Sequence, residues 1–244
     1  MIITTSWDDG HPLDNKLVEL LEKYGIKGTF YIPLANAENK VMVRSQIKEI
    51  SNCHEIGGHT VNHRYLDGLS YEEAKYEITQ CKIQLEEITG QPITAFCYPG
   101  GKYSERDIEL VQQAGFLFGR TTDYFNIKAD TKYSLMYTSV QAYNHSALTL
   151  SKHCIKRANC ISLFQQHFFI PFNHSFQKLS LNLLKKAVEE NGIFHLWGHS
   201  WEIDKFGLWN ELEETFNILK NETNALFLNN SDYWQYVKKQ SLNK

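Results

Sequence analysis

The chain has 244 residues, of which 42% are hydrophobic and 22% are charged, and its formal net charge at pH 7 is −3. This length and composition are typical of a globular protein with a large apolar core, and we expect residues 1–244 to form one domain. The small negative charge argues against binding to nucleic acid or to an anionic membrane surface. The sequence has neither a stretch that predicts a membrane span nor a recognisable signal peptide, so we expect a cytoplasmic protein.

Segments with strand and helix patterns alternate along the chain. The first are a β-branched run at residues 2–7 and an amphipathic helix at 14–25, which ends at Gly25. Residues 146–175 give no clear pattern and are left unassigned. Repeated strand–helix units favour a parallel sheet that is closed, or nearly closed, into a barrel. The remaining strands are expected at 28–33, 55–60, 93–99, 116–122, 134–141, 193–199 and 224–230, and the remaining helices at 45–53, 71–90, 104–115, 179–192 and 208–221.

Polar clusters follow the predicted strands at the point where each strand ends. They read DDG at 8–10, GGHTVNH at 57–63, YPGG at 98–101, RTTD at 120–123 and GHSWE at 198–202. In a parallel barrel the carboxyl ends of the strands meet at one face, and barrel enzymes build their active sites there. The sequence therefore predicts an active site formed by these clusters.

His59 and His63 have the spacing i and i+4, so on a helical turn both imidazoles would point the same way. Two imidazoles and one carboxylate are a common ligand set for a divalent metal. The adjacent Asp8 and Asp9 then have an explanation, because one carboxylate can bind the cation while the other acts as a general base. Alternatively, one of the aspartates caps the helix that begins near Asp14.

Four segments, SWDDG, HTVNH, FCYPGGKY and HLWGH, occur in the order of the motifs of the polysaccharide deacetylase family, the NodB-homology group of carbohydrate esterases. The similarity runs from Thr5 to about Glu202. The resemblance implies a deformed (β/α) barrel with seven to eight parallel strands. It also implies hydrolysis of the acetyl group of an N-acetylated sugar. The set of two imidazoles and one carboxylate indicates one divalent metal ion, for which zinc is the first choice.

The same resemblance implies roles for particular residues. Asp8 would be the catalytic base, and Asp9 would bind the metal together with His59 and His63. His199, in the last motif, would be the general acid that protonates the leaving amine.

The pocket residues also follow from the resemblance. The backbone N–H of Gly100 would stabilise the oxyanion, and Tyr98 of the same motif is assigned to the pocket. Leu196 and Trp197, which precede the acid histidine, are candidates for the wall of the acetyl pocket.

The sequence departs from the family pattern at two points. Cys97 stands where the family has an arginine that holds the base, and the aspartate–tryptophan motif that orients the acid histidine is missing. Arg120 and Asp123, at the next predicted strand end, are our candidates for the missing cation and for the partner of His199. His195 is the alternative acid, because it shares a face of its strand with His199.

Two other interpretations remain open. The same barrel and metal could hydrolyse a non-sugar amide bond. Alternatively, the chain could be a carbohydrate-binding protein that retains the metal site without turnover. Acetate release distinguishes the deacetylase from the binding protein, and a panel of substrates distinguishes the deacetylase from the amidase.

Overall fold

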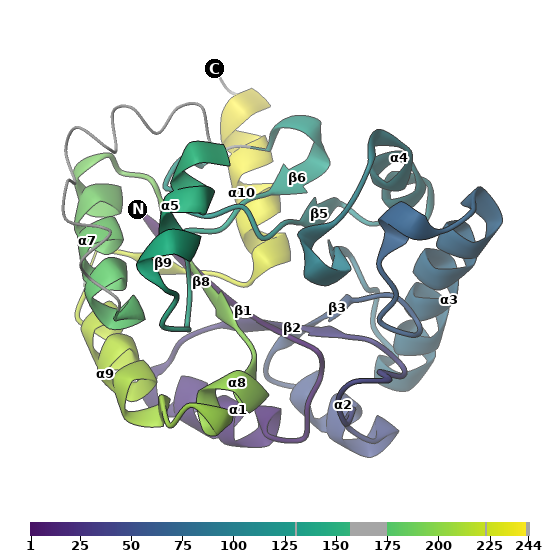
Figure 1. Ribbon diagram of the computed structural model, residues 1–244, viewed down its shortest axis with the longest axis horizontal. Helices are drawn as coiled ribbons and strands as arrows, with labels where there is room; N and C mark the ends of the chain where they lie inside the picture. Colours follow the sequence, from purple (N-terminus) through teal and green to yellow (C-terminus); the bar gives the residue numbers. More distant parts are fainter. Residues whose placement is uncertain (130, 157–174, 223, 243–244) are drawn as a thin grey trace.

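The computed structural model describes residues 1–129, 131–156, 175–222 and 224–242 (Figure 1). Within these ranges no helix has both the length and the apolar character needed to cross a membrane. The strands are β1 (Ile2–Asp8), β2 (Gly28–Ile32), β3 (Glu55–Gly58), β4 (Ala95–Cys97), β5 (Phe118–Arg120), β6 (Leu135–Met136), β7 (Val140–Gln141), β8 (Ile193–Gly198) and β9 (Leu226–Phe227). The helices are α1 (Asp14–Tyr24), α2 (Arg44–Ile50), α3 (Tyr71–Thr89), α4 (Glu105–Gln113), α5 (Ala147–Lys156), α7 (Phe176–Glu189), α8 (Ser200–Lys205), α9 (Trp209–Lys220) and α10 (Asn230–Leu242).

The strands form one parallel sheet in the order β6-β5-β4-β3-β2-β1-β8-β7, with β9 paired to β1 beside this path. Helices α1, α2, α3, α7 and α9 lie around the outside of the curved sheet (Figure 1). The predicted deformed (β/α) barrel is therefore confirmed. Within the previously unassigned stretch, α5 begins at Ala147, and residues 157–174 lie outside the described residues.

The two edge strands of the sheet, β6 and β7, follow each other in the chain. Three residues separate Met136 from Val140, so the two edges lie within about 14 Å of each other at the maximal rise of an extended chain. The segment 134–141, predicted as one strand, thus forms two short strands on opposite edges. This connection brings the sheet close to a closed barrel.

The helices cover the barrel through apolar stripes. In α1, Leu17 and Leu21 are fully buried, as their spacing on one helical face predicts. Gly25 ends this helix with φ 63° and donates its backbone N–H to the carbonyls of Leu21 and Glu22. The left-handed conformation explains why glycine stands at this position.

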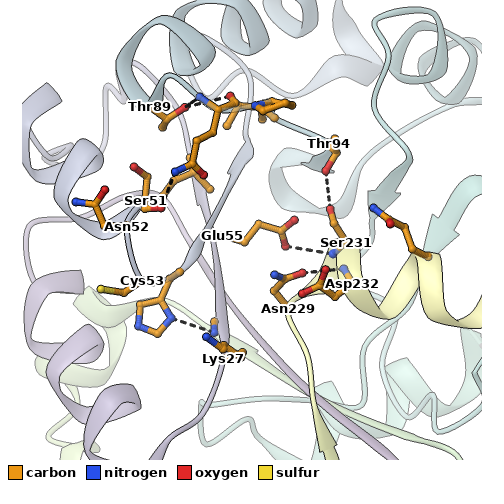
Figure 2. Close-up of a pocket in the computed structure, with 17 residues that line it drawn as sticks. Lys27, Ser51, Asn52, Cys53, Glu55, Thr89, Thr94, Asn229, Ser231 and Asp232 are labelled. Carbon is orange, nitrogen blue, oxygen red and sulfur yellow. Dashed lines mark hydrogen bonds between the residues drawn. The ribbon is translucent and has the colours of Figure 1, made fainter.

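Helix α10 closes the amino end of the barrel. Trp234 of this helix is fully buried and stacks on Phe118 at 4.9 Å between ring centroids. Glu55 accepts hydrogen bonds from the backbone N–H groups of Asn230 and Ser231, at 3.0 and 3.2 Å, and so caps the helix. A cavity of about 420 Å³ lies here (Figure 2), but its polar groups bond largely to one another, as Thr94 and Ser231 do. We therefore assign this end to stability and look for chemistry at the carboxyl end.

Candidate active site

At the carboxyl end of the barrel the strands surround a cavity of about 360 Å³. Its walls come from the polar clusters that the sequence places at the strand ends, so the predicted convergence occurs. Among the lining residues are Asp8, Asp9, His59, His63, Gly100, Trp197, His199, Trp201 and Glu202.

Three potential metal ligands meet at this cavity. Asp9 Oδ1 lies 3.0 Å from His63 Nε2 and 3.6 Å from His59 Nε2. The expectation of a helical turn at 59–63 is wrong, because Thr60 and His63 adopt left-handed conformations with φ 63° and 55°. The two rings nevertheless face the same point, with centroids 5.0 Å apart. Asp9 is left-handed as well, with φ 77°, and such conformations of non-glycine residues cluster at functional sites.

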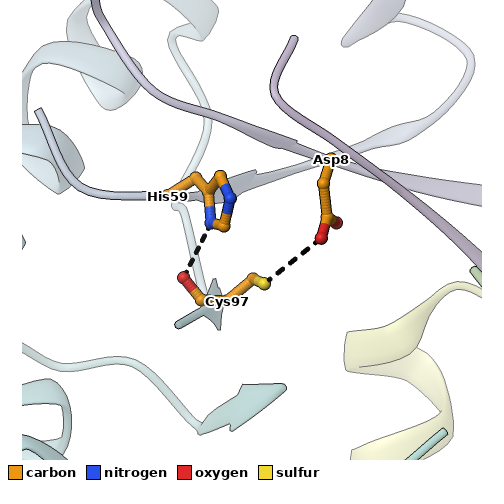
Figure 3. Close-up of side chains that lie close together, drawn as sticks. All are labelled: Asp8, His59 and Cys97. Atoms are coloured by element: carbon orange, nitrogen blue, oxygen red, sulfur yellow. Dashed lines mark hydrogen bonds between the residues drawn. The ribbon is translucent and has the colours of Figure 1, made fainter. Parts of the chain in front are cut away.

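A hydrogen bond fixes which nitrogen of His59 faces Asp9. His59 Nδ1 lies 2.8 Å from the carbonyl oxygen of Cys97 (Figure 3). Because a carbonyl can only accept, Nδ1 carries the proton and the lone pair of a neutral ring is on Nε2. Asp8, His59 and Cys97 also lie close enough together to form a second ligand group. That group is the poorer one, because burial raises the pKa of the Cys97 thiol well above its ordinary value and opposes the thiolate that a metal needs.

Asp8 forms a buried ion pair with Arg120, which is fully buried. Cys97 and Arg120 are direct neighbours in the register of β4 and β5, so both side chains reach the level of Asp8. The Cys97 thiol lies 3.7 Å from the second oxygen of Asp8. The arginine that the family pattern places at the position of Cys97 is thus replaced by one from the next strand.

We expect Arg120→Ala to lower the free energy of unfolding by about 3–5 kcal/mol, because the change leaves the buried Asp8 carboxylate without its partner. Denaturant unfolding of the wild type and the variant measures this difference in the free energy of unfolding. The control is Lys23→Ala, which breaks the exposed pair with Glu213 and should lower the free energy of unfolding far less. Equal losses for both variants would argue against a structural role for the Asp8–Arg120 pair.

His199, at the N-terminus of α8, pairs with Glu202 rather than with the expected Asp123. His199 Nδ1 lies 2.5 Å from Glu202 Oε2, which also accepts a hydrogen bond from Gln141 at 2.9 Å. Burial opposes the charged imidazole, but the Glu202 hydrogen bond and the charges of Asp9 and Asp8 outweigh it and raise the pKa of His199 to about 9. The expectation for Asp123 fails because Glu202 lies one helical turn beyond His199 on α8 and reaches the ring first.

Residues 2–119 match the family model described as polysaccharide deacetylase. Over this segment the chain is similar to the polysaccharide deacetylase family. The peptidoglycan-N-acetylglucosamine deacetylase of Bacillus cereus is 30% identical over 118 residues, which are 47% of this chain and 54% of that protein. YxkH of Bacillus subtilis is 29% identical over 125 residues, 50% of this chain and 44% of that protein. The chain thus spans about half the length of these curated relatives.

Solved structures share the fold over nearly the whole chain. A Mycobacterium smegmatis protein assigned to the polysaccharide deacetylases covers 98% of this chain and 91% of its own, with a TM-score of 0.70 and 15% identity. A family 4 acetyl xylan esterase from Clostridium thermocellum, solved with a cobalt ion, covers 97% and 91%, with a TM-score of 0.59 and 14% identity. At such low identity these neighbours support the barrel, including its second half, which the polysaccharide deacetylase model does not match.

Two of the four pocket residues expected from the polysaccharide deacetylase resemblance line the cavity. These are Gly100, whose φ is 61°, and Trp197. Leu196 is buried in the apolar core, because successive side chains of β8 point to opposite faces. Tyr98 is also a core residue: its ring covers Gly119 and stacks on Tyr103 at 4.7 Å between centroids. Leu196 and Tyr98 are therefore corrected to packing residues.

His195, the alternative acid, is fully buried inside the barrel. Its two ring nitrogens bond to the hydroxyls of Thr4 and Ser6, at 2.5 and 2.9 Å. Burial and the nearby Arg120 charge keep its pKa well below the ordinary value. It is therefore a poor proton donor.

The sequence analysis placed Trp201 and Glu202 in a predicted site cluster without assigning a role to either, and it did not place Gln141 in the site. Glu202 has a detectable signal, since an acidic residue three positions after a helix start is a capping pattern. No comparable pattern marks Gln141 and Trp201, whose partners are distant in the sequence.

Proposed function

We propose that this chain is a metal-dependent hydrolase that removes the acetyl group from an N-acetylated carbohydrate. The observation that carries the proposal is a complete set of groups on one cavity. A carboxylate held by a buried cation, three potential metal ligands and a histidine with a raised pKa all face it. A purely binding protein has no need of both a base and an acid.

The donor set of Asp9, His59 and His63 suits a divalent cation. Asp9 Oδ1 is buried without a hydrogen-bond partner in the described part of the chain, and the Nε2 atoms of both histidines lie beside it. Two imidazoles and a carboxylate favour zinc. When bound, the metal would supply Lewis-acid polarisation of the acetyl carbonyl.

The residues of the chain account for the proton transfers. Asp8 takes a proton from the water whose oxygen attacks the acetyl carbon, and Arg120 holds the carboxylate in place for this step. The N–H of Gly100 is our candidate donor to the oxyanion that develops on the former carbonyl oxygen. His199 then gives its proton to the nitrogen as the C–N bond breaks, so that acetate and a free amine leave.

Acetate release tests the proposal. The purified protein is incubated with chitooligosaccharides, nucleotide-linked N-acetylated sugars, peptidoglycan fragments and simple N-acetyl amides, and acetate is measured enzymatically. Release from at least one carbohydrate, but not from the simple amides, supports the carbohydrate deacetylase. Release from the amides alone would favour the non-sugar amidase, and binding without release would favour the inactive protein.

We expect about one equivalent of zinc per chain after reconstitution, measured by elemental analysis. Changing His59 and His63 together to alanine should abolish stoichiometric binding, because Asp9 alone is too weak a ligand set. The matched control changes His11 and His145 to alanine, since neither belongs to the ligand group. Retention of one equivalent by the His59/His63 variant would overturn the site.

A further inference from the structure

The first turn of α8 contacts the metal-ligand candidate Asp9 through an indole. Trp201 Nε1 donates a hydrogen bond to Asp9 Oδ2 at 2.9 Å. We propose that Trp201 tunes the metal site by holding Asp9 so that only Oδ1 is offered to the cation. This inference rests on the metal centre proposed above.

The two oxygens of Asp9 have different surroundings. Oδ2 is occupied by the indole N–H, whereas Oδ1 faces His59 and His63 and has no hydrogen-bond partner in the described residues. Asp9 is only 3% exposed, so water cannot readily take the place of the indole. Without this donor, Oδ2 would be a bare, buried anionic atom and would turn toward the cation. The indole therefore favours binding through one oxygen and leaves room for water and substrate.

The position of Trp201 is fixed by its neighbours on α8. Ser200 donates a hydrogen bond to the buried Asp14 at 2.5 Å, which ties the start of α8 to α1. His199 is held by Glu202 and lies 5.5 Å from the Trp201 ring, between centroids. The donor is thus held in place before any metal binds, as outer-shell groups that orient ligands usually are.

The chain offers a matched control for this hydrogen bond. Trp209 Nε1 donates to Asp204 Oδ1, also at 2.9 Å, but this pair is exposed and belongs to neither ligand group. Trp201→Phe and Trp209→Phe therefore remove the same kind of bond, from an indole to a carboxylate, at two places. Phenylalanine keeps most of the ring and removes the N–H.

The experiment measures zinc affinity by competition with a chromophoric chelator in the apo protein and its variants. Outer-shell changes typically cost 10–100-fold in affinity, and we expect a loss in this range for Trp201→Phe and no change for Trp209→Phe. The visible absorption of the cobalt-loaded variant should weaken, because a second Asp9 oxygen raises the coordination number. If Trp201→Phe binds zinc as tightly as the wild type and its cobalt spectrum is unchanged, the inference about Trp201 is overturned. The proposed metal centre would still stand in that case, provided that the wild type binds stoichiometric zinc. A wild type that binds no metal would overturn both.

A measurement on the wild type keeps the test valid if Trp201→Phe does not fold. The indole protons of the five tryptophans are assigned by NMR and their exchange with solvent is followed in the zinc-loaded protein. The Trp201 proton should exchange far more slowly than that of Trp209, whose bond is exposed. Equal exchange would show that the Trp201–Asp9 bond is absent and would overturn the inference.

Discussion

Asp8→Asn is expected to lower acetate release by about 10²–10⁴-fold, the usual range for loss of a general base. Asparagine keeps the shape of the side chain but cannot take the proton from the attacking water. Zinc content should stay near one equivalent, because Asp9 Oδ1, rather than Asp8, lies beside both histidine Nε2 atoms.

Elemental analysis and acetate assays on the same preparation distinguish the role of Asp8 from that of Asp9. Asp204→Asn, at an exposed carboxylate outside the cavity, is the control and should change neither quantity. Loss of zinc from Asp8→Asn would make Asp8 a ligand and reverse the assigned roles. Full activity would remove Asp8 from the mechanism.

The second large effect concerns His199 and pH. His199 must be protonated to act as the acid and Asp8 must be ionised to act as the base, so the rate should follow a bell-shaped pH profile. Its basic limb reflects loss of the imidazole proton. Since Glu202 stabilises the protonated ring, Glu202→Gln lowers the pKa of His199, and the limb should move to lower pH by about one to three pH units. His199→Ala should abolish the limb.

Asp123→Asn is the matched control for this shift, because Asp123 was the partner expected from the sequence. The basic limb of the pH–rate profile of Asp123→Asn should coincide with that of the wild type. A shift in Asp123→Asn but not in Glu202→Gln would restore the sequence-based assignment. A basic limb that survives in His199→Ala would show that another group is the acid.

The barrel could be predicted because its strands are buried runs separated by amphipathic helices, and both patterns are local. The main candidate residues of the site could be predicted for a related reason, because the carboxyl ends of parallel strands meet at one face. Helix α10 was missed because no element was predicted after the strand at 224–230, of which only Leu226–Phe227 pairs in the sheet. Its buried residues Tyr233, Trp234 and Val237 contact the barrel interior from one face of the helix, so a helical stripe was present in the sequence.

The finer geometry depended on contacts that the sequence does not encode locally. The left-handed residues Thr60 and His63 turn the two imidazoles together without a helix, and no glycine marks these positions. The choice between Asp123 and Glu202 required knowing that a helix begins directly after His199. Leu196 could have been rejected beforehand, since it alternates with Trp197 along the strand.

The side-by-side positions of Cys97 and Arg120 have a consequence for classifying related sequences. Because β4 and β5 are in parallel register, either strand can deliver a guanidinium to the same carboxylate. A sequence search that scores each aligned motif position separately would find no arginine at the position of Cys97 and would classify this chain as inactive. A criterion based on which side chain lies beside Asp8 would find the required cation in this chain. Chains that lack the arginine at this position should therefore be checked for a cation on the adjacent strand before they are set aside as pseudoenzymes.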